Sequence, residues 1–128
     1  MRYLLDTHII LWWLYDDPKL PRRHRQIITK PDNHIIVSVA SLWEIEIKRA
    51  IGKLVVDSGY IDAIKSEGFK LLSIHAGHIV KLHSLSLHHN DPFDRMLIAQ
   101  AKAECMIFLT IDKMVKKYDI EIINGLRG

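Results

Sequence analysis

The sequence of 128 residues contains one cysteine, Cys105, and few residues that interrupt regular structure. A lone cysteine excludes an internal disulfide and a zinc site built on cysteine pairs, and it is typical of a reducing compartment. The 6 glycines and 4 prolines are not gathered into a linker. No repeat or low-complexity tract divides the chain. We therefore expect one domain, residues 1–128, that is large enough to bury a hydrophobic core.

Long hydrophobic runs are also missing. No apolar stretch approaches the ~20 residues that span a bilayer. The N-terminal segment "MRYLLDTHIILWWLYDD" has a charge within its apolar part and lacks the small-residue cleavage site of a secretory signal. We therefore expect a cytoplasmic protein without membrane association. The formal net charge of +3 permits nucleic-acid binding but does not indicate it.

Short apolar runs alternate regularly with amphipathic segments. The pattern predicts strands at residues 2–5, 34–38, 69–74, 106–112 and 120–123. It predicts helices at residues 8–15, 21–30, 41–54, 58–68, 75–85, 91–104 and 113–118. In the third helix we expect Ser41 to be the N-cap, Gly52 to mark the end, and Leu42, Ile45 and Ala50 to face inward. This alternation predicts an α/β fold with a mainly parallel sheet covered by helices on both faces.

Four acidic residues occupy similar positions in this predicted fold. Asp6 and Asp112 follow strands, whereas Glu44 and Asp94 lie in the first turns of helices. The active crevice of a parallel sheet lies beyond the carboxyl ends of its strands, so these side chains are expected to converge. Asp91, three residues before Asp94, is either a fifth member of the group or the cap of its helix.

Carboxylates that lie close together raise one another's pKa unless a cation compensates their charge. Oxygen ligands suit Mg²⁺ or Mn²⁺, and such ions activate water for attack on phosphorus. The hydroxyls of Thr7 and Thr110 are placed to orient water or a carboxylate. Each acid alone has an ordinary explanation as a helix-dipole partner or a turn residue. Four together favour a metal site.

Several basic residues are candidates for substrate contact. Lys48 and Arg95 each lie within one helical turn of an acid of this group, where they either bind a substrate phosphate or pair with the acid. Arg22 and Arg23 are candidates for contact with an RNA backbone. A solvated helix face explains these two arginines almost as well.

The remaining histidines and apolar residues give weaker signals. Five histidines suggest a metal cluster at first sight: His75, His78, His83, His88 and His89. No cysteine or suitably spaced acid accompanies them, so we expect surface or loop residues and no zinc site. Two of the three tryptophans are expected to pack in the core, and the helix at residues 8–15 is a candidate dimer or partner surface. Cys105 is expected in the core.

Four segments together resemble PIN-domain proteins, specifically the VapC-type ribonuclease toxins of toxin–antitoxin pairs: "LLDTHIILWWL", "SVASLWEIEIKRAIGKL", "HHNDPFDRMLIAQA" and "LTIDK". They occur in the family's order and cover nearly the whole chain, and the two middle segments are the most specific. The resemblance implies that the metal-binding and catalytic acids are Asp6, Glu44, Asp94 and Asp112. It also matches Thr110 to the hydroxyl residue that the family has before its last acid. Asp94 fits the position of the family's third acid better than Asp91 does, so Asp91 is expected to cap the helix.

The resemblance further implies a five-stranded parallel sheet in an α/β/α sandwich, with strand order 3-2-1-4-5. It implies Mg²⁺- or Mn²⁺-dependent hydrolysis of RNA by metal-activated water, which leaves a 5′-phosphate and a 3′-hydroxyl. The implied partners are a cognate antitoxin and a second copy of the chain, in a homodimer or a toxin–antitoxin hetero-oligomer. The antitoxin would supply the DNA-binding domain, since this chain has no DNA-reading motif.

Three other interpretations stay open. A haloacid-dehalogenase-like phosphatase also has an Asp after its first strand, but it needs a second Asp two residues later, where this chain has His8. A phosphate-receiver domain needs a pair of acids after the first strand, which this chain lacks. A catalytically silent module with the PIN fold would bind RNA or a partner without cleavage, and the intact acids argue against it.

Overall fold

The computed structural model describes residues 1–85, 91–112 and 122–124. Its strands are β1 (Arg2–Leu5), β2 (His34–Ser38), β3 (Lys70–Leu72), β4 (Ile107–Thr110) and β5 (Ile122–Asn124). Its helices are α1 (Thr7–Leu14), α2 (Arg22–Thr29), α3 (Val39–Ala50), α4 (Tyr60–Ser66), α5 (Ala76–Ser84) and α6 (Pro92–Glu104). These elements have the predicted types and order; the helix predicted at residues 113–118 lies outside the described residues. None of the described helices has the length and apolar character needed to cross a bilayer.

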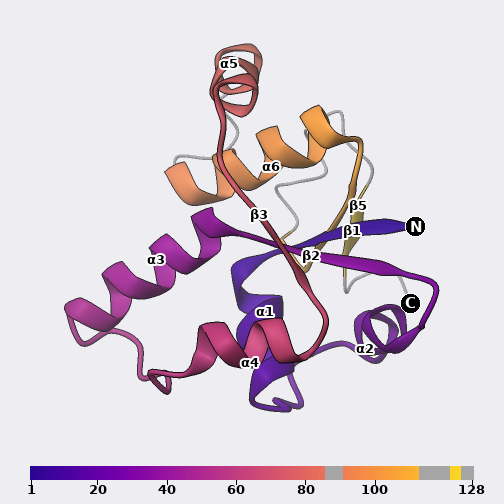
Figure 1. The fold of residues 1–128 in the computed structure, drawn as a ribbon, viewed down its shortest axis with the longest axis vertical. Helices are drawn as coiled ribbons and strands as arrows, with labels where there is room; N and C mark the ends of the chain where they lie inside the picture. Colours follow the sequence, from indigo (N-terminus) through magenta and orange to yellow (C-terminus); the bar gives the residue numbers. More distant parts are fainter. Residues whose placement is uncertain (86–90, 113–121, 125–128) are drawn as a thin grey trace.

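The strands form a parallel sheet in which β1 occupies the centre (Figure 1). Strands β3, β2, β1 and β4 make up its body, and the short β5 pairs with β4, which gives the order β3-β2-β1-β4-β5. Leu4 of β1 lies opposite Ile36 of β2 and Phe108 of β4. This topology confirms the predicted parallel sheet and strand order. It also places the carboxyl ends of all strands at one edge.

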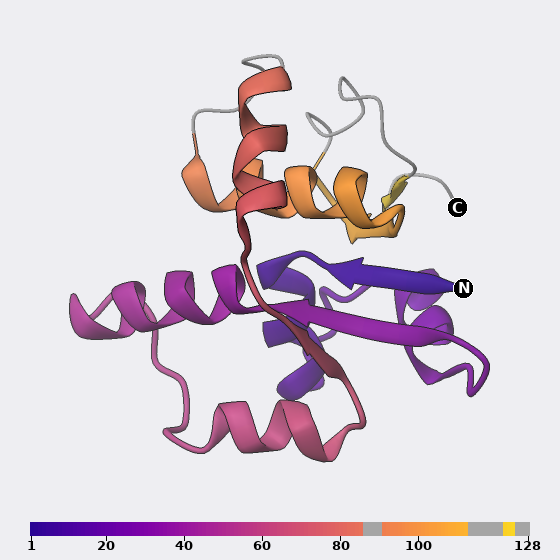
Figure 2. The same ribbon diagram turned by 45° about the horizontal axis from the view of Figure 1, so that its top comes forward.

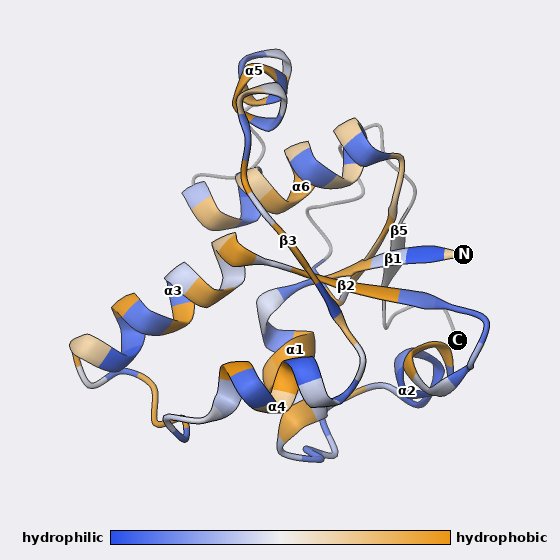
Figure 3. Ribbon diagram, viewed as in Figure 1, coloured by the Kyte–Doolittle hydropathy of each residue, from blue (hydrophilic) through white to orange (hydrophobic). Residues whose placement is uncertain are grey.

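Two hydrophobic cores lie on the two faces of the sheet. Successive strand residues point to opposite faces, so Leu5 and Leu109 join the core beneath α1–α4, whereas Leu4 and Phe108 join the core beneath α5 and α6. Figure 2 shows α5 and α6 on one side of the sheet and α1, α2 and α4 on the other. In Figure 3 the strands are largely apolar while the helices carry mixed faces. The three-layer α/β/α sandwich is therefore confirmed.

Helix α3 begins earlier than predicted. Its N-cap is Ser38, whose side chain accepts a hydrogen bond from the amide of Ala40 at 3.0 Å. Ser41, the predicted cap, lies inside the helix, where its hydroxyl accepts a hydrogen bond from Thr7 at 2.9 Å. Strand β2 runs into α3 without a loop, so the last residue of the strand serves as the cap. Gly52, with φ 74°, follows the helix in the left-handed conformation expected at a helix end.

Some apolar residues lie closer to solvent than predicted. Trp12 and Trp13 are half-buried against the core, as expected for two tryptophans, whereas Trp43 is 60% exposed. Ala50, predicted to face inward, is exposed because it lies in the last turn of α3, beyond the sheet. Cys105 is exposed as well, since it follows α6 with φ 54° at the helix end rather than packing within the helix.

Candidate active site

The carboxyl ends of the central strands carry two of the four acids. Asp6 directly follows β1 and is the N-cap of α1. Asp112 follows β4 by two residues. The amide of Asp6 donates a hydrogen bond to the carbonyl of Leu109 at 2.9 Å, which continues the pairing of β1 with β4. The sheet itself therefore brings these two acids to the same edge.

Helices α3 and α6 bring the other two acids. Glu44 is buried in α3, and Asp94 is half-buried in the first turn of α6. The two helices start near one another at this edge of the sheet (Figure 1). Asp91 is the N-cap of α6, and its side chain accepts hydrogen bonds from the amides of Phe93 at 2.8 Å and Asp94 at 3.2 Å. The expectation that Asp91 caps the helix is confirmed.

The electrostatics of Asp94 indicate that the acids lie near one another. Burial, followed by the negative charges of Asp6, Asp91, Glu44 and Asp112, raises the pKa of Asp94 to about 8. Apart from Asp91, these residues come from other parts of the chain than Asp94. Carboxylates raise one another's pKa in this way when they lie close together with little solvent between them. The raised pKa of Asp94 therefore supports the predicted convergence.

Thr110 fixes the position of the Asp6 carboxylate. Its hydroxyl donates a hydrogen bond to Asp6 Oδ2 at 2.6 Å and accepts one from the amide of Asp112 at 3.0 Å. Burial raises the pKa of Asp6 above its usual range, and the Thr110 hydrogen bond and the nearby His8 oppose this rise. Thr110 thus links two acids of the site and orients one of them, as the sequence suggested.

Two other buried polar residues, Thr7 and His24, form hydrogen bonds that hold neighbouring helices and strands together beside the site. Thr7 was predicted to orient water or a carboxylate, but its hydroxyl donates to Ser41 and ties α1 to α3. His24 of α2 is fully buried, with Nε2 at 2.8 Å from the carbonyl oxygen of Thr110. Burial lowers the pKa of His24, so the ring is neutral and donates this hydrogen bond. A single histidine in a basic helix carries no sequence signal for this role.

The donor set fits a hard divalent cation. Glu44 Oε2 accepts a hydrogen bond from Lys48 Nζ at 2.8 Å, whereas Glu44 Oε1 is buried and has no hydrogen-bond partner among the described residues. A buried charged oxygen without a partner is costly, and a cation with carboxylate ligands removes that cost. Within residues 1–85 and 91–112, no three of the site's acids bring oxygens within 4.8 Å of one another. Water or phosphate oxygens would therefore have to complete the ligand shell of a Mg²⁺ or Mn²⁺ ion held by these acids.

The predicted basic residues lie in different settings. Lys48 pairs with Glu44, and this hydrogen bond raises the pKa of Lys48. Arg95 donates to a main-chain carbonyl of α5 at 3.2 Å. Arg22 and Arg23 are exposed on α2, the helix that His24 holds against the end of β4. Their contact with a substrate stays a prediction.

An aromatic pair flanks the acids, and the sequence had not singled it out. Trp43 precedes Glu44, Phe93 precedes Asp94, and their rings meet edge to face with centroids 5.1 Å apart. They line an apolar hollow of about 220 Å³ together with Ala40, Ile74, Leu82, Pro92 and Met96. The exposed ring of Trp43 and the half-buried ring of Phe93 therefore provide an apolar surface next to two of the acids.

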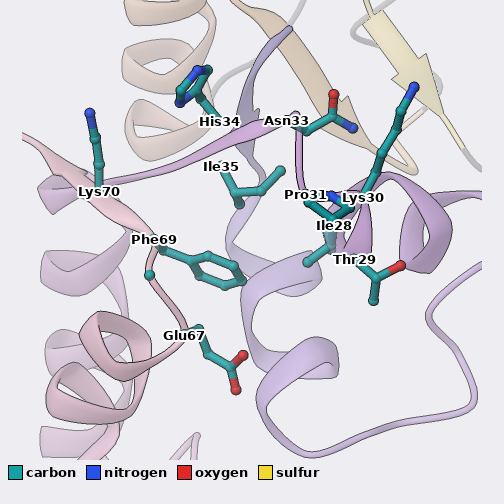
Figure 4. Close-up of a pocket in the computed structure, with 11 residues that line it drawn as sticks. Ile28, Thr29, Lys30, Pro31, Asn33, His34, Ile35, Glu67, Phe69 and Lys70 are labelled. Carbon is teal, nitrogen blue, oxygen red and sulfur yellow. The ribbon is translucent and has the colours of Figure 1, made fainter.

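A second hollow, of about 290 Å³, lies at the opposite edge of the sheet near the starts of β2 and β3 (Figure 4). Its rim includes Lys30, His34 and Lys70. In Figure 4 the two lysine side chains extend apart, away from Phe69 and Ile35. Because these cations do not converge and only one acid lines the hollow, it lacks the ligand set found at the carboxyl edge.

The family model of the PIN domain matches residues 3–121. The chain belongs to the PIN-domain family. Membership in this family rules out the interpretations as a phosphatase or a receiver domain. No curated protein sequence matches the chain.

Solved structures share the fold of this PIN domain at low sequence identity. A chain in the crystal structure of VapBC2 from Rickettsia felis, bound to a DNA fragment from their promoter, is 17% identical with a TM-score of 0.74, over 97% of this chain and 98% of that one. A chain of VapBC-1 from nontypeable Haemophilus influenzae is 19% identical with a TM-score of 0.69, over 99% and 100%. A chain of FitAcB from Neisseria gonorrhoeae is 16% identical with a TM-score of 0.66, over 98% and 99%.

Proposed function

We propose that this PIN domain is a metal-dependent endoribonuclease and the toxin of a toxin–antitoxin pair. The observation that carries the proposal is the crevice in which Asp94 meets the charges of Asp6, Glu44 and Asp112. Their mutual repulsion, together with the unpartnered oxygen of Glu44, is what a divalent cation would relieve. Such a cation bound by carboxylates is the usual means of phosphodiester hydrolysis without a protein nucleophile.

The four acids would hold one or two Mg²⁺ or Mn²⁺ ions. When bound, such an ion activates water and stabilises the leaving oxygen during in-line attack on phosphorus. Thr110 keeps the Asp6 carboxylate in a fixed orientation, and Lys48 binds Glu44 Oε2, which leaves Oε1 as the oxygen that would ligate the ion. Asp94 must release its proton before its carboxylate can ligate, so ion binding near neutral pH is coupled to proton release.

The basic residues around the crevice suit a polyanionic substrate. Arg22 and Arg23 are exposed on α2, whose His24 contacts the end of β4. Lys48 lies close to Glu44, Asp91 and Asp94, and Arg95 follows Asp94 in α6. Cations at such positions bind phosphate groups without reading the base sequence. We therefore assign these four residues to contacts with the RNA backbone on either side of the cleaved bond.

An antitoxin is the proposed protein partner. The structural neighbours include chains of VapBC2 and VapBC-1, and VapBC2 is bound to a DNA fragment from its promoter. By this likeness the chain would act in the cytoplasm and assemble as a homodimer or with its antitoxin. The partner would make the DNA contacts, since this sequence has no DNA-reading motif.

The proposal is tested with purified protein, an RNA pool and a phosphate monoester. Cleavage of RNA is expected with Mg²⁺ or Mn²⁺, with loss on adding EDTA and no hydrolysis of the monoester. Asp6→Asn should abolish cleavage, whereas Asp32→Asn, at an exposed loop acid, should not. Undiminished cleavage by the Asp6 variant would refute the site. RNA binding without any cleavage would instead indicate the catalytically silent module.

A further inference from the structure

Three ligating side chains with no part in the proposed nuclease site meet where α5 begins and α6 ends. His75 is the N-cap of α5, His78 lies in its first turn, and Glu104 is the last residue of α6. Glu104 Oε2 lies 2.8 Å from His78 Nε2 and 3.3 Å from His75 Nε2. One ligating atom from each residue lies within 4.8 Å of the other two.

The sequence did not predict this cluster. No acid near His75 and His78 in the sequence completes a site, but folding brings in Glu104, which is 26 residues from His78. His78 is fully buried rather than a surface residue, whereas His83 is exposed as expected. His88 and His89 lie outside the described residues.

The cluster is separate from the acidic crevice. Asp94 lies in the first turn of α6 and Glu104 is its last residue. Ten residues of α-helix correspond to about 15 Å, at a rise of ~1.5 Å per residue. Glu44 belongs to α3, which contributes no residue to this cluster. An ion in one site therefore has no ligand in common with the other.

We propose that His75, His78 and Glu104 bind one divalent transition-metal ion, with Zn²⁺ the best match. Two imidazole nitrogens and one carboxylate oxygen form a three-ligand zinc set that water completes. With bonds of ~2.0–2.2 Å, tetrahedral geometry places neighbouring ligand atoms about 3.3–3.6 Å apart. The 3.3 Å between His75 Nε2 and Glu104 Oε2 already matches this spacing. Mg²⁺ prefers oxygen ligands, so the histidines distinguish this site from the acidic crevice.

Gln100 provides a second, independent indication. Its side chain is fully buried, its Oε1 has no hydrogen-bond partner among the described residues, and its Nε2 lies 3.3 Å from His78 Nδ1. Turning the amide over exchanges its oxygen and nitrogen, and Oε1 then accepts a hydrogen bond from His78 Nδ1–H. A histidine that binds a metal through one ring nitrogen commonly donates the other N–H to such a carbonyl.

This change exchanges one hydrogen-bond arrangement for another. Without an ion, His78 donates from Nε2 to Glu104, and Nδ1 accepts a long hydrogen bond of 3.3 Å from the amide of His75. With an ion, the proton moves to Nδ1 and the freed Nε2 ligates. The ion replaces the 2.8 Å hydrogen bond between His78 and Glu104, because both atoms of that bond become its ligands. The exchange also gives up the long bond from His75 and the 3.4 Å bond from Gln100 to the carbonyl of Ser73, both at the weak end of hydrogen-bond geometry.

The surroundings hold the ligands in place. The rings of His75 and His78 lie against each other with centroids 3.6 Å apart. A Cβ at Gly77 would lie 3.1 Å from the His75 ring, so the glycine lets that ring fold over the first turn of α5. Arg2 donates to the carbonyl of Glu104 at 2.8 Å, and its Nη2 lies 4.0 Å from Oε1. This cation faces Oε1 and leaves Oε2 for the ion.

The experiment uses the full chain, stripped of metal and then held in millimolar Mg²⁺ so that the acidic crevice is occupied. Zn²⁺ is titrated by calorimetry, and the ring resonances of the histidines are followed by NMR. The wild type and the control His83→Gln should bind one equivalent of Zn²⁺, with shifts at His75 and His78. His75→Gln, at an exposed position that leaves the His78–Glu104 pair intact, should bind at least about tenfold more weakly.

Two results would overturn the zinc site. One is equal Zn²⁺ affinity in wild type and His75→Gln, and the other is binding without shifts of the His75 and His78 rings. If His75→Gln is poorly folded, Gly77→Ala provides the second variant, because it displaces the ring while favouring the helix. None of these measurements depends on RNA cleavage, so the zinc site and the proposed nuclease can fail separately.

Discussion

Replacing Asp94 by Asn should stabilise the metal-free protein. Burial and the charges of the other acids hold the pKa of Asp94 at about 8, against an ordinary value of 3.8. The carboxyl is therefore protonated in the fold near neutral pH and ionised in the unfolded chain. Because the folded protein then binds more protons than the unfolded chain, its free energy of unfolding falls as pH rises from 3.8 towards 8. An asparagine side chain is neutral in both states, so the variant does not lose this stability as pH rises.

The size of the effect follows from the pKa difference. One pKa unit corresponds to ~1.36 kcal/mol, so the full shift would be about 5 kcal/mol at pH 7.5 for a carboxyl shielded from solvent. Asp94 is only half-buried, and solvent screening reduces this to about 1–2 kcal/mol. For a chain of this length such a gain raises Tm by roughly 3–8 °C. At pH 4.5 the difference should shrink to about a fifth, because this pH lies only about 0.7 units above the ordinary pKa of 3.8.

The assay is thermal unfolding of wild type and Asp94→Asn in EDTA at pH 4.5 and 7.5, with Asp32→Asn as the control. Adding Mg²⁺ at pH 7.5 should raise the Tm of the wild type more than that of Asp94→Asn, because the ion relieves a repulsion that the variant lacks. An equal or lower Tm for Asp94→Asn at pH 7.5 would refute the reasoning. So would an equal Mg²⁺ response in both proteins.

Two further predictions concern residues behind the acids. Thr110→Val removes the donor to Asp6 and should lower kcat for RNA about 10–100-fold while KM and the folded state are kept. Steady-state kinetics with circular dichroism check this, and Thr110→Ser should restore most of the activity. Because burial lowers the pKa of His24, stability should fall as pH drops below 6.5, the ordinary value. Urea unfolding at pH 5 and 7 measures this, and His24→Gln should show a smaller pH dependence.

The sequence was a good guide wherever the local pattern decides the structure. Strand and helix types agree with the fold, because apolar periodicity and helix-start signals are local properties. The sheet order and the capping role of Asp91 also agree, but the resemblance to PIN-domain proteins had implied them. Asp6 and Asp112 could be placed together because parallel strands end at one edge. Ser38 was missed as the cap of α3 because a strand that runs directly into a helix leaves no loop to mark the boundary.

Long-range contacts could not be read from the sequence. Thr7 stands beside Asp6 in the chain, yet its hydroxyl turns to Ser41 of another helix. Glu104 completes a cluster with two histidines of α5 only because α5 packs across α6. His24 contacts a strand end 86 residues away. Such contacts depend on how the layers pack together, which no spacing within a single element encodes.

The central claim is that Asp6 ligates the catalytic ion, and metal rescue tests it most directly. In a Cys105→Ser background, Asp6→Cys replaces a hard oxygen ligand by a thiolate, which favours softer ions over Mg²⁺. The account predicts that RNA cleavage by Asp6→Cys is lost in Mg²⁺ and partly restored by Mn²⁺ or Cd²⁺, with no restoration for Asp6→Ala. Cleavage by Asp6→Cys in Mg²⁺ at the wild-type rate would contradict it, as would failure of every softer ion to restore activity.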